Sequence, residues 1–193
     1  YNLTNVVDDS LMEITHVIRG EDHVSNTPKQ ILIYNALGFK VPTFAHLPMI
    51  LGEDKKRLSK RHGATGVNEY ESMGYQPDAL LNYLVLLGWN PGTDEEIFDL
   101  DSLVKNFDIR KVQKKSAIYD QKKFNWISLQ HLMKEDSVKV LNRLASIDPE
   151  WGESKSQDYL IKVIDLMKPR SNSLTDLIDQ SRYFFSSPKE FDS

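Results

Sequence analysis

The segment from Met12 to His23, MEITHVIRGEDH, is the most informative about the fold. Within it, Glu13 to Ile18 alternates polar and apolar residues, which is the pattern of a half-buried β-strand. A polar cluster, Arg19 to His23, then ends the strand. A helix is predicted to follow, with Thr27 as its N-cap and Pro28 at its first position. A strand that leads into a helix in this way predicts a mixed α/β fold for the front of the chain.

The segments around this unit extend the prediction in both directions. Leu3 to Val7 is short and partly β-branched, so we expect a strand there, ended by a turn at Asp8, Asp9 and Ser10. Phe44 to Leu51 is the next strand candidate. From about Gln76 the pattern becomes helical, with helices expected over 79–87, 100–107, 138–144, 158–167 and 173–185; the first is apolar nearly all round and is expected to be buried. The predicted fold class is mixed α/β and mainly α, with a soft boundary near residue 130.

Composition excludes several classes of protein. The 193 residues include no cysteine, so a disulfide scaffold, a cysteine nucleophile and a thiolate metal site are ruled out. The five histidines lack metal-ligand spacing, and we expect no metal site and no zinc. No apolar run approaches the ~18 residues of a membrane helix, and nothing resembles a secretion signal, so a cytoplasmic protein without a membrane partner is expected. The chain opens on Tyr1 without a methionine, which suggests a piece of something longer.

The most distinctive segment is the basic stretch from Lys55 to Gly63, KKRLSKRHG, with five cations in seven residues. Lysine supplies point charges, serine a hydroxyl donor and glycine close backbone approach, a combination that suits a polyphosphate. Leu58 would anchor such a loop while Ser59 and Lys60 project from it. The alternative is a solvated basic loop, or a weak RNA or membrane contact. Composition alone favours neither reading, and the net charge of −4 argues against a wholesale nucleic-acid coat.

The polar cluster after the first predicted strand is the second candidate site. Ligands of open α/β sheets bind beyond the carboxyl ends of strands, so Arg19 could pair with a carboxylate there. Taken alone, the same cluster reads more readily as a surface turn. Asp8 and Asp9 do not form a paired-carboxylate site, because adjacent residues on a strand face opposite sides. His46 is predicted to be a packed polar residue and not a ligand.

Together these segments resemble the bacterial glutamyl-tRNA synthetases, which are class I aminoacyl-tRNA synthetases. The resemblance is carried by residues 1–9, 12–23, 26–30, 57–64 and 80–89, and it continues more weakly to residue 184. It implies the end of a class I nucleotide-binding, Rossmann-like fold over 1–23. It also implies a stem-contact region over 24–130 and the first helical anticodon-binding subdomain over 131–193.

The basic stretch matches the KMSKS signature of that family, with Arg57 in place of the usual first lysine. The resemblance implies that Ser59 and Lys60 are catalytic, with Lys60 stabilising the negative charge on the phosphates of ATP during adenylate formation. ATP, bound as its Mg²⁺ complex, would also contact Arg57 and the main chain of Met49, Ile50 and Leu51. Arginine keeps the charge of the first position but presents a planar fork in place of a compact ammonium.

The other implied roles belong to the amino acid and the tRNA. Tyr1, Asn5 and Arg19 match positions that line the glutamate pocket, where Arg19 would pair with a substrate carboxylate. Asp22, His23 and Arg61 would lie near ATP or the tRNA 3′ end. The implied partners are tRNA, glutamate and ATP, and a monomer is expected.

The resemblance also implies limits. The HIGH signature of the family does not occur in these residues, so the isolated chain is expected to be inactive. A tRNA-contacting module without activity is one alternative. The glutamyl-queuosine tRNA synthetase-like paralogue is another, although the helical region beyond residue 130 argues against it. Glutaminyl-tRNA synthetase is related but differs in sequence around Arg19.

Overall fold

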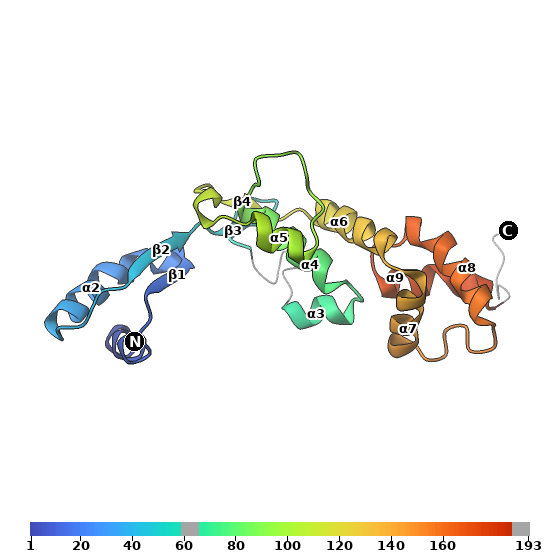
Figure 1. Ribbon diagram of the computed structural model, residues 1–193, viewed down its shortest axis with the longest axis horizontal. Helices are drawn as coiled ribbons and strands as arrows, with labels where there is room; N and C mark the ends of the chain where they lie inside the picture. Colours follow the sequence, from blue (N-terminus) through green and yellow to red (C-terminus); the bar gives the residue numbers. More distant parts are fainter. Residues whose placement is uncertain (59–65, 187–193) are drawn as a thin grey trace. The chain divides into compact units, whose positions relative to one another are not determined.

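A computed structural model describes residues 1–58 and 66–186 of the chain (Figure 1). These residues form two compact units. The first contains residues 1–58 and 113–119, and the second contains the described residues of 59–112 and 120–193. Within the described ranges, no helix has the length and apolar character needed to cross a membrane. The observed elements confirm the prediction of a mainly helical mixed α/β chain.

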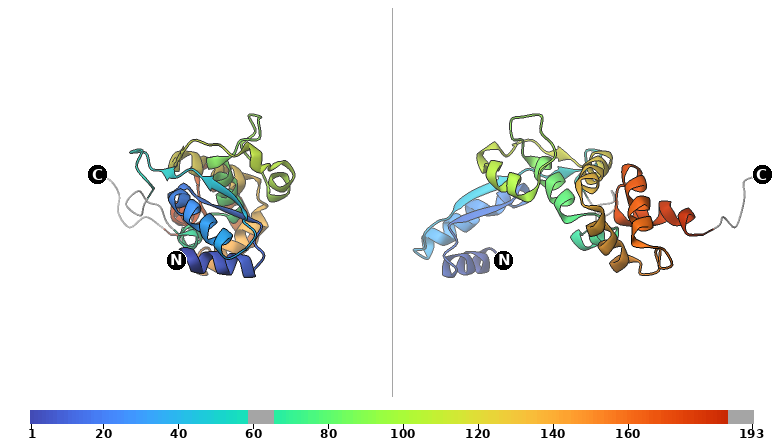
Figure 2. Two further views of the ribbon diagram at one scale, coloured as in Figure 1. Left: turned by 90° about the vertical axis from the view of Figure 1, so that its left-hand side faces the viewer. Right: turned by 45° about the vertical axis from the view of Figure 1, so that its right-hand side comes forward.

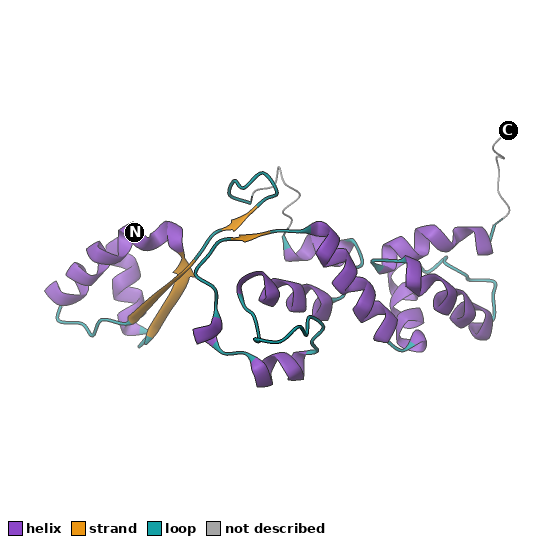
Figure 3. Ribbon diagram, turned by 90° about the horizontal axis from the view of Figure 1, so that it is seen from above, coloured by secondary structure: helices purple, strands orange, loops and turns teal. Residues whose placement is uncertain are grey.

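The first unit is built on a βαβ arrangement. Strand β1 (His16–Gly20) pairs in parallel with β2 (Thr43–Leu47), in a register that joins His16 to Thr43 and Gly20 to Leu47 (Figure 3). The connection between them runs through a 3₁₀ segment, η1 (Glu21–Asn26), and helix α2 (Thr27–Ala36). Parallel strands need such a crossover, and the alternating and helical patterns on either side of Arg19 therefore predicted the right unit.

Helix α1 (Asn2–Leu11) corrects the prediction for the start of the chain. The strand expected over Leu3 to Val7 and the turn expected at residues 8–10 are both wrong, because one helix covers them. The face of α1 that meets α2 is largely polar: Asn2 and Asn5 are hydrogen-bonded to Gln30, and Asp9 accepts from the Tyr34 hydroxyl at 3.5 Å. Leu3, Val6, Val7 and Leu11 do recur with helical spacing, but the short β-branched run was read as a strand instead.

The strand predicted over Phe44 to Leu51 is two strands. Pro48 follows β2, and a proline cannot donate to a sheet ladder, so β2 ends at Leu47. A second strand, β3 (Ile50–Leu51), pairs in parallel with β4 (Ala117–Ile118). The chain then folds back, with the backbone N–H of Leu58 donating to the carbonyl of Ile50 at 2.9 Å.

The second unit is helical. Its α-helices are α3 (Val67–Ser72), α4 (Pro77–Gly88), α5 (Leu100–Asn106), α6 (Gln121–Lys134), α7 (Ser137–Ile147), α8 (Gln157–Met167) and α9 (Leu174–Ser181), joined by 3₁₀ turns at Ile109–Lys111 and Lys168–Arg170 and followed by one at Arg182–Phe184. Side chains at the N-caps of five of these helices accept backbone N–H groups of the first turn: Asp99, Asp120, Asp136, Ser156 and Ser173. Such caps satisfy donors that the helix itself cannot.

Two groups of buried side chains hold this unit together. Phe124 of α6 lies against the rings of Tyr70, Tyr75 and Tyr83, with centroid separations of 5.4, 4.6 and 5.1 Å. Helices α7, α8 and α9 surround a second core (Figures 1 and 2), which includes Leu132, Val140, Leu144, Trp151, Val163, Ile164, Met167, Leu174, Leu177 and Ile178. Helix α6 contributes to both groups and so joins the middle of the chain to its end.

The helix predictions for this unit are confirmed at five places, and two helices were missed. α4, α5, α7, α8 and α9 fall where helical spacing placed them, whereas α3 and α6 were not predicted. The expectation that α4 is buried all round is wrong in part. Ala79 is completely buried, but Leu81 and Leu84 are 37% and 44% exposed.

A buried amide, that of Asn82, determines which ring nitrogen of His131 on α6 carries the proton. The side-chain oxygen of Asn82 accepts from the backbone N–H of Phe98 at 2.8 Å and faces Nε2 of His131 at 2.9 Å, while its Nδ2 donates to the Glu96 carbonyl at 3.0 Å. The amide therefore cannot be reversed, and Nε2 of His131 carries a proton. Burial lowers the pKa of His131 below its ordinary value of 6.5.

This lowered pKa predicts a pH-dependent stability. Below about pH 6.5 the unfolded chain binds a proton at His131, whereas the folded chain does not until the pH is lower. The free energy of unfolding should therefore decrease as the pH is lowered. Urea unfolding from about pH 7.5 to about pH 5.5 measures this loss. His131→Gln keeps a donor for Asn82 but does not titrate, and its loss of stability over the same range should be smaller. Equal losses in the two proteins would show that His131 does not titrate abnormally.

Candidate functional site

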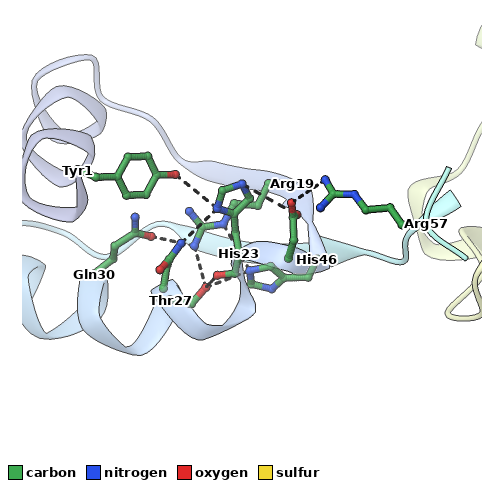
Figure 4. Close-up of polar contacts among 9 residues, drawn as sticks. Tyr1, Arg19, His23, Thr27, Gln30, His46 and Arg57 are labelled. Atoms are coloured by element: carbon green, nitrogen blue, oxygen red, sulfur yellow. Dashed lines mark hydrogen bonds and ion pairs between the residues drawn. The ribbon is translucent and has the colours of Figure 1, made fainter. Parts of the chain in front are cut away.

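Arg19, near the end of β1, is the centre of a polar network in the first unit (Figure 4). Its Nη2 donates to Oγ1 of Thr27 and to Oε1 of Gln30, both at 2.8 Å. Its Nε faces Nε2 of His46 at 3.4 Å, and its guanidinium lies 5.2 Å from the centre of the Phe44 ring. The side chain is thus held from α2 on one side and from β2 on the other.

The local sequence explains how these groups meet. Side chains of a strand alternate, and Val17 and Arg19 are the less exposed residues of β1. His46 is the partner of Arg19 in the parallel register, so their side chains leave the sheet on the same face. Thr27 and Gln30 are three residues apart on α2 and therefore share one side of the helix.

Helix α1 completes this network through Gln30. The Gln30 side chain is only 1% exposed, and its Nε2 donates to Oδ1 of Asn5 at 3.0 Å and to Oδ1 of Asn2 at 3.3 Å. Gln30 therefore joins Arg19 of the strand to Asn5 of the helix. These two residues, 14 positions apart in sequence, are brought to one place by a third side chain.

Tyr1 and His23 form a second part of the site. The Tyr1 hydroxyl lies 3.4 Å from Nδ1 of His23, and the two rings are stacked with centroids 6.3 Å apart. The Asn26 amide nitrogen also approaches this Nδ1, at 3.2 Å. Tyr1, His23 and Asn26 are therefore held together around one ring nitrogen. The Thr27 hydroxyl, 3.4 Å from the His23 carbonyl, links this part to Arg19.

Arg57 and the segment 49–51 lie at the other edge of the site. Arg57 is exposed and its Nη2 is 3.3 Å from a carboxylate oxygen of Asp22. The backbone N–H of Met49 donates to Glu21 at 3.0 Å. The Leu51 carbonyl accepts from the backbone N–H of Tyr119 at 2.8 Å. The polar cluster after β1 therefore contacts both segments that were predicted to meet ATP.

The structure groups most of the residues that the sequence singled out. Tyr1, Asn5, Arg19, Asp22 and His23 lie in one unit with Arg57 and residues 49–51. Ser59, Lys60 and Arg61 lie outside the described residues. The individual roles assigned to all these side chains stay predictions. In the part of the chain that the structure describes, no group of three or more histidine, aspartate or glutamate side chains is placed to hold a metal ion.

Two contributors to the site were missed or misassigned. Thr27 was predicted to cap α2, but Asn26 is the N-cap and makes no capping hydrogen bond, while the Thr27 hydroxyl binds Arg19. Gln30 was not singled out at all. No local signal marked it, because Thr27 on the same side of the helix is also polar. His46 was predicted to be a packed polar residue, and it is half-buried between Arg19 and Thr27.

Comparison with protein families gives two adjacent matches. Residues 1–126 match the family described as tRNA synthetases class I (E and Q), catalytic domain. Residues 129–193 match the anticodon binding domain family. The first match covers well over half of the chain and contains every residue of the network around Arg19.

Similar proteins point the same way. The chain is 45% identical to a glutamate–tRNA ligase of Moorella thermoacetica over 96% of its length, and 46% identical to one of Syntrophobacter fumaroxidans over 100%. It covers 39% and 41% of those proteins, and so spans about two fifths of the relatives it matches. Among solved structures, a glutamate tRNA ligase of Elizabethkingia meningosepticum, in complex with its amino acid, superposes with a TM-score of 0.88 at 34% identity, over 100% of this chain and 42% of that one.

These matches confirm the resemblance seen in the sequence. The fold predicted from it, the end of a class I catalytic domain followed by a helical anticodon-binding part, is likewise confirmed. The chain belongs to the class I tRNA synthetase family of the glutamate and glutamine enzymes, and it joins a catalytic-domain match to an anticodon-binding-domain match as the glutamate–tRNA ligases that it resembles do over the same two fifths of their length.

Proposed function

We propose that the protein containing this chain activates glutamate with ATP, releasing pyrophosphate, and transfers the glutamyl group to the 3′ end of its tRNA. The observation that carries the proposal is the Arg19 network at the end of β1, in a chain 45% identical to a glutamate–tRNA ligase over 96% of its length. The network holds a positively charged side chain in one orientation. The similarity to a glutamate–tRNA ligase suggests the reaction, in which the amino acid carries a side-chain carboxylate.

The glutamate pocket of this proposal consists of Tyr1, Asn5 and Arg19. Among the described residues, Nη1 of Arg19 has no hydrogen-bond partner, so one arm of the fork is left to pair with a substrate carboxylate. Arginine is charged at all physiological pH values and donates only, which suits a carboxylate that accepts only. The other arm is tied to Thr27 and Gln30, so the fork is oriented before the substrate binds, and less ordering entropy is lost on binding.

The ATP site of this proposal combines the basic stretch with the segment 49–51. Lys60, together with Ser59 and Arg57, would hold the phosphates of the ATP–Mg²⁺ complex, and the main chain of Met49, Ile50 and Leu51 would meet the base. Cations aimed at phosphate oxygens stabilise the charge that builds up as the adenylate forms and pyrophosphate leaves. Asp22, His23 and Arg61 would lie near ATP or the tRNA end. The hydrogen bond from Met49 to Glu21 holds this segment beside the polar cluster.

The remaining parts of the proposal concern organisation and partners. We divide the chain into the end of the catalytic fold (1–23), a stem-contact region (24–130) and a first anticodon-binding subdomain (131–193). The change of family match between residues 126 and 129 supports the second boundary. The partners are tRNA, glutamate and ATP, and the protein acts as a cytoplasmic monomer. The anticodon-binding match argues against the glutamyl-queuosine paralogue, which is expected to lack that part.

ATP–pyrophosphate exchange tests the activation step. The full-length gene product should exchange pyrophosphate only when both glutamate and tRNA are added, since this family is expected to need bound tRNA for activation. The isolated 193-residue chain should show no exchange, because it holds no HIGH tetrapeptide for the other side of the ATP site. Exchange by the isolated chain would overturn this division of the site. A chain that binds tRNA, with a salt dependence lost in the Lys60→Ala and Arg61→Ala variants, would instead favour the tRNA-contacting module.

A further inference from the structure

Gln30 is the buried link between the two groups of the proposed glutamate pocket that come from different elements. Its Oε1 accepts from Arg19 at 2.8 Å, and its Nε2 donates to Asn5 at 3.0 Å. At 1% exposure the amide cannot exchange these partners for water. Nothing in the proposed function requires a glutamine at this position, since neither end of its side chain needs to touch a substrate.

The direction of each hydrogen bond in this link is fixed by chemistry. A guanidinium has no acceptor, so the oxygen of the Gln30 amide must face Arg19. The nitrogen of the Gln30 amide must then face Asn5, and Asn5 must accept this hydrogen bond with its side-chain oxygen. Asn2 meets the same nitrogen with its oxygen, at 3.3 Å. The charge on Arg19 therefore determines, through one glutamine, which end of the Asn5 amide is left free.

The free end of Asn5 is a donor. Nδ2 of Asn5 has no hydrogen-bond partner in the described ranges 1–58 and 66–186, and the residue is half-buried. The same holds for Nη1 of Arg19. The link thus leaves two unpaired donors on the residues that the proposed function assigns to the amino acid, and it prevents the Asn5 amide from presenting an acceptor.

We propose that Gln30 is a specificity-determining positioning residue, which sets the polarity of Asn5 so that the pocket takes a side-chain carboxylate and rejects a carboxamide. The inference rests on the proposed function. A glutamate side chain offers one carboxylate oxygen to each donor, whereas a glutamine side chain has a single acceptor oxygen and carries an NH₂ group in place of the second. A buried donor left facing a donor loses a hydrogen bond, and sites built on such pairing discriminate strongly.

Gln30→Glu in the full-length gene product tests this directly. A carboxylate at residue 30 accepts from both sides, so Asn5 must rotate to donate to it and must present its oxygen to the pocket. The ratio of kcat/KM for glutamate to that for glutamine, measured by tRNA-dependent ATP–pyrophosphate exchange, should fall by at least about tenfold. Gln157→Glu is the matched control, because Gln157 is exposed at the first turn of α8 and the same substitution there should leave the ratio unchanged.

A second variant tests the same role in case Gln30→Glu does not fold. Asn5→Asp keeps an acceptor for Gln30 but places another acceptor where Nδ2 stands, and it should lower the same ratio. Loss of a merely structural role would lower kcat/KM for both amino acids alike and leave the ratio unchanged. If the wild-type protein prefers glutamate and both variants keep that preference within about twofold, the role of Gln30 is wrong and the proposed function stands. If the wild-type protein uses neither amino acid, the proposed function fails and this inference fails with it.

Discussion

Arg19→Ala in the full-length gene product should raise the KM for glutamate by about 100-fold, with a much smaller change in kcat. The arginine is charged, half-buried and oriented by Thr27, Gln30 and His46, so its removal would take away the proposed charge-assisted pair with the substrate. Truncating one member of such a pair costs about 2–5 kcal/mol. Initial rates of tRNA-dependent ATP–pyrophosphate exchange at varied glutamate measure the effect.

Two further variants define what the Arg19 result means. Arg19→Lys keeps the charge but cannot bind three partners from one planar fork, so its KM should lie between those of wild type and Arg19→Ala. Arg110→Ala removes an exposed arginine that is paired with Asp108, two residues before it, and should leave the KM unchanged. A KM within about twofold of wild type for Arg19→Ala would show that the carboxylate binds elsewhere.

Gly74→Ala should destabilise the second unit by about 3 kcal/mol or more. Gly74 lies between α3 and α4 with φ of +73°, and its carbonyl accepts from the backbone N–H of Leu174 at 2.9 Å. A Cβ at this position would stand 2.7 Å from the backbone nitrogen of Thr175, which cannot move without displacing the start of α9. Leu174 is completely buried in the core of α7, α8 and α9, so that displacement would disturb the core.

Gly92→Ala separates backbone strain from this clash. Gly92 is in the same unit with φ of +91°, but a Cβ there would meet nothing within 4 Å. Its substitution should cost about 1–2 kcal/mol, the penalty of the left-handed conformation alone. Urea unfolding of the isolated chain, followed by the fluorescence of its three tryptophans, all of which lie in the second unit, compares the two variants. Equal losses of stability would mean that a Cβ at residue 74 does not clash with the start of α9.

The parts of the fold that could be predicted from sequence are those whose packing faces are apolar. Helices α4, α7 and α8 can be recognised from the helical spacing of their apolar residues and from the residues at their ends, and Pro77 marks the start of α4. α6 cannot, because Trp126 and Met133 are exposed on its other side and a polar group stands on its packing face. On α6, for instance, Ser128 is buried and donates to the carbonyl of Asn172. Such a contact is satisfied by a residue 44 positions away and leaves no local signal.

The site shows the same division. Arg19 could be identified because a strand that ends in a polar cluster is a recurring place for ligands in α/β proteins. Gln30 could not, because its role depends on α1 and β1 both lying beside α2, and the sequence predicted a strand where α1 is. Thr27 was read as a cap since its position before Pro28 is typical of one, and only the structure shows its hydroxyl bound to Arg19.

In the proposed function, this chain belongs to an enzyme that charges tRNA with glutamate through the Arg19 pocket. The most direct measurement is the amount of amino acid attached to tRNA by the full-length gene product, with ATP and either labelled glutamate or labelled glutamine. We expect that glutamate is attached, that glutamine is not, and that Arg19→Ala lowers the initial rate of attachment about 50-fold at glutamate concentrations near the wild-type KM. Attachment of glutamine in preference to glutamate, or attachment of glutamate that does not depend on Arg19, would contradict it.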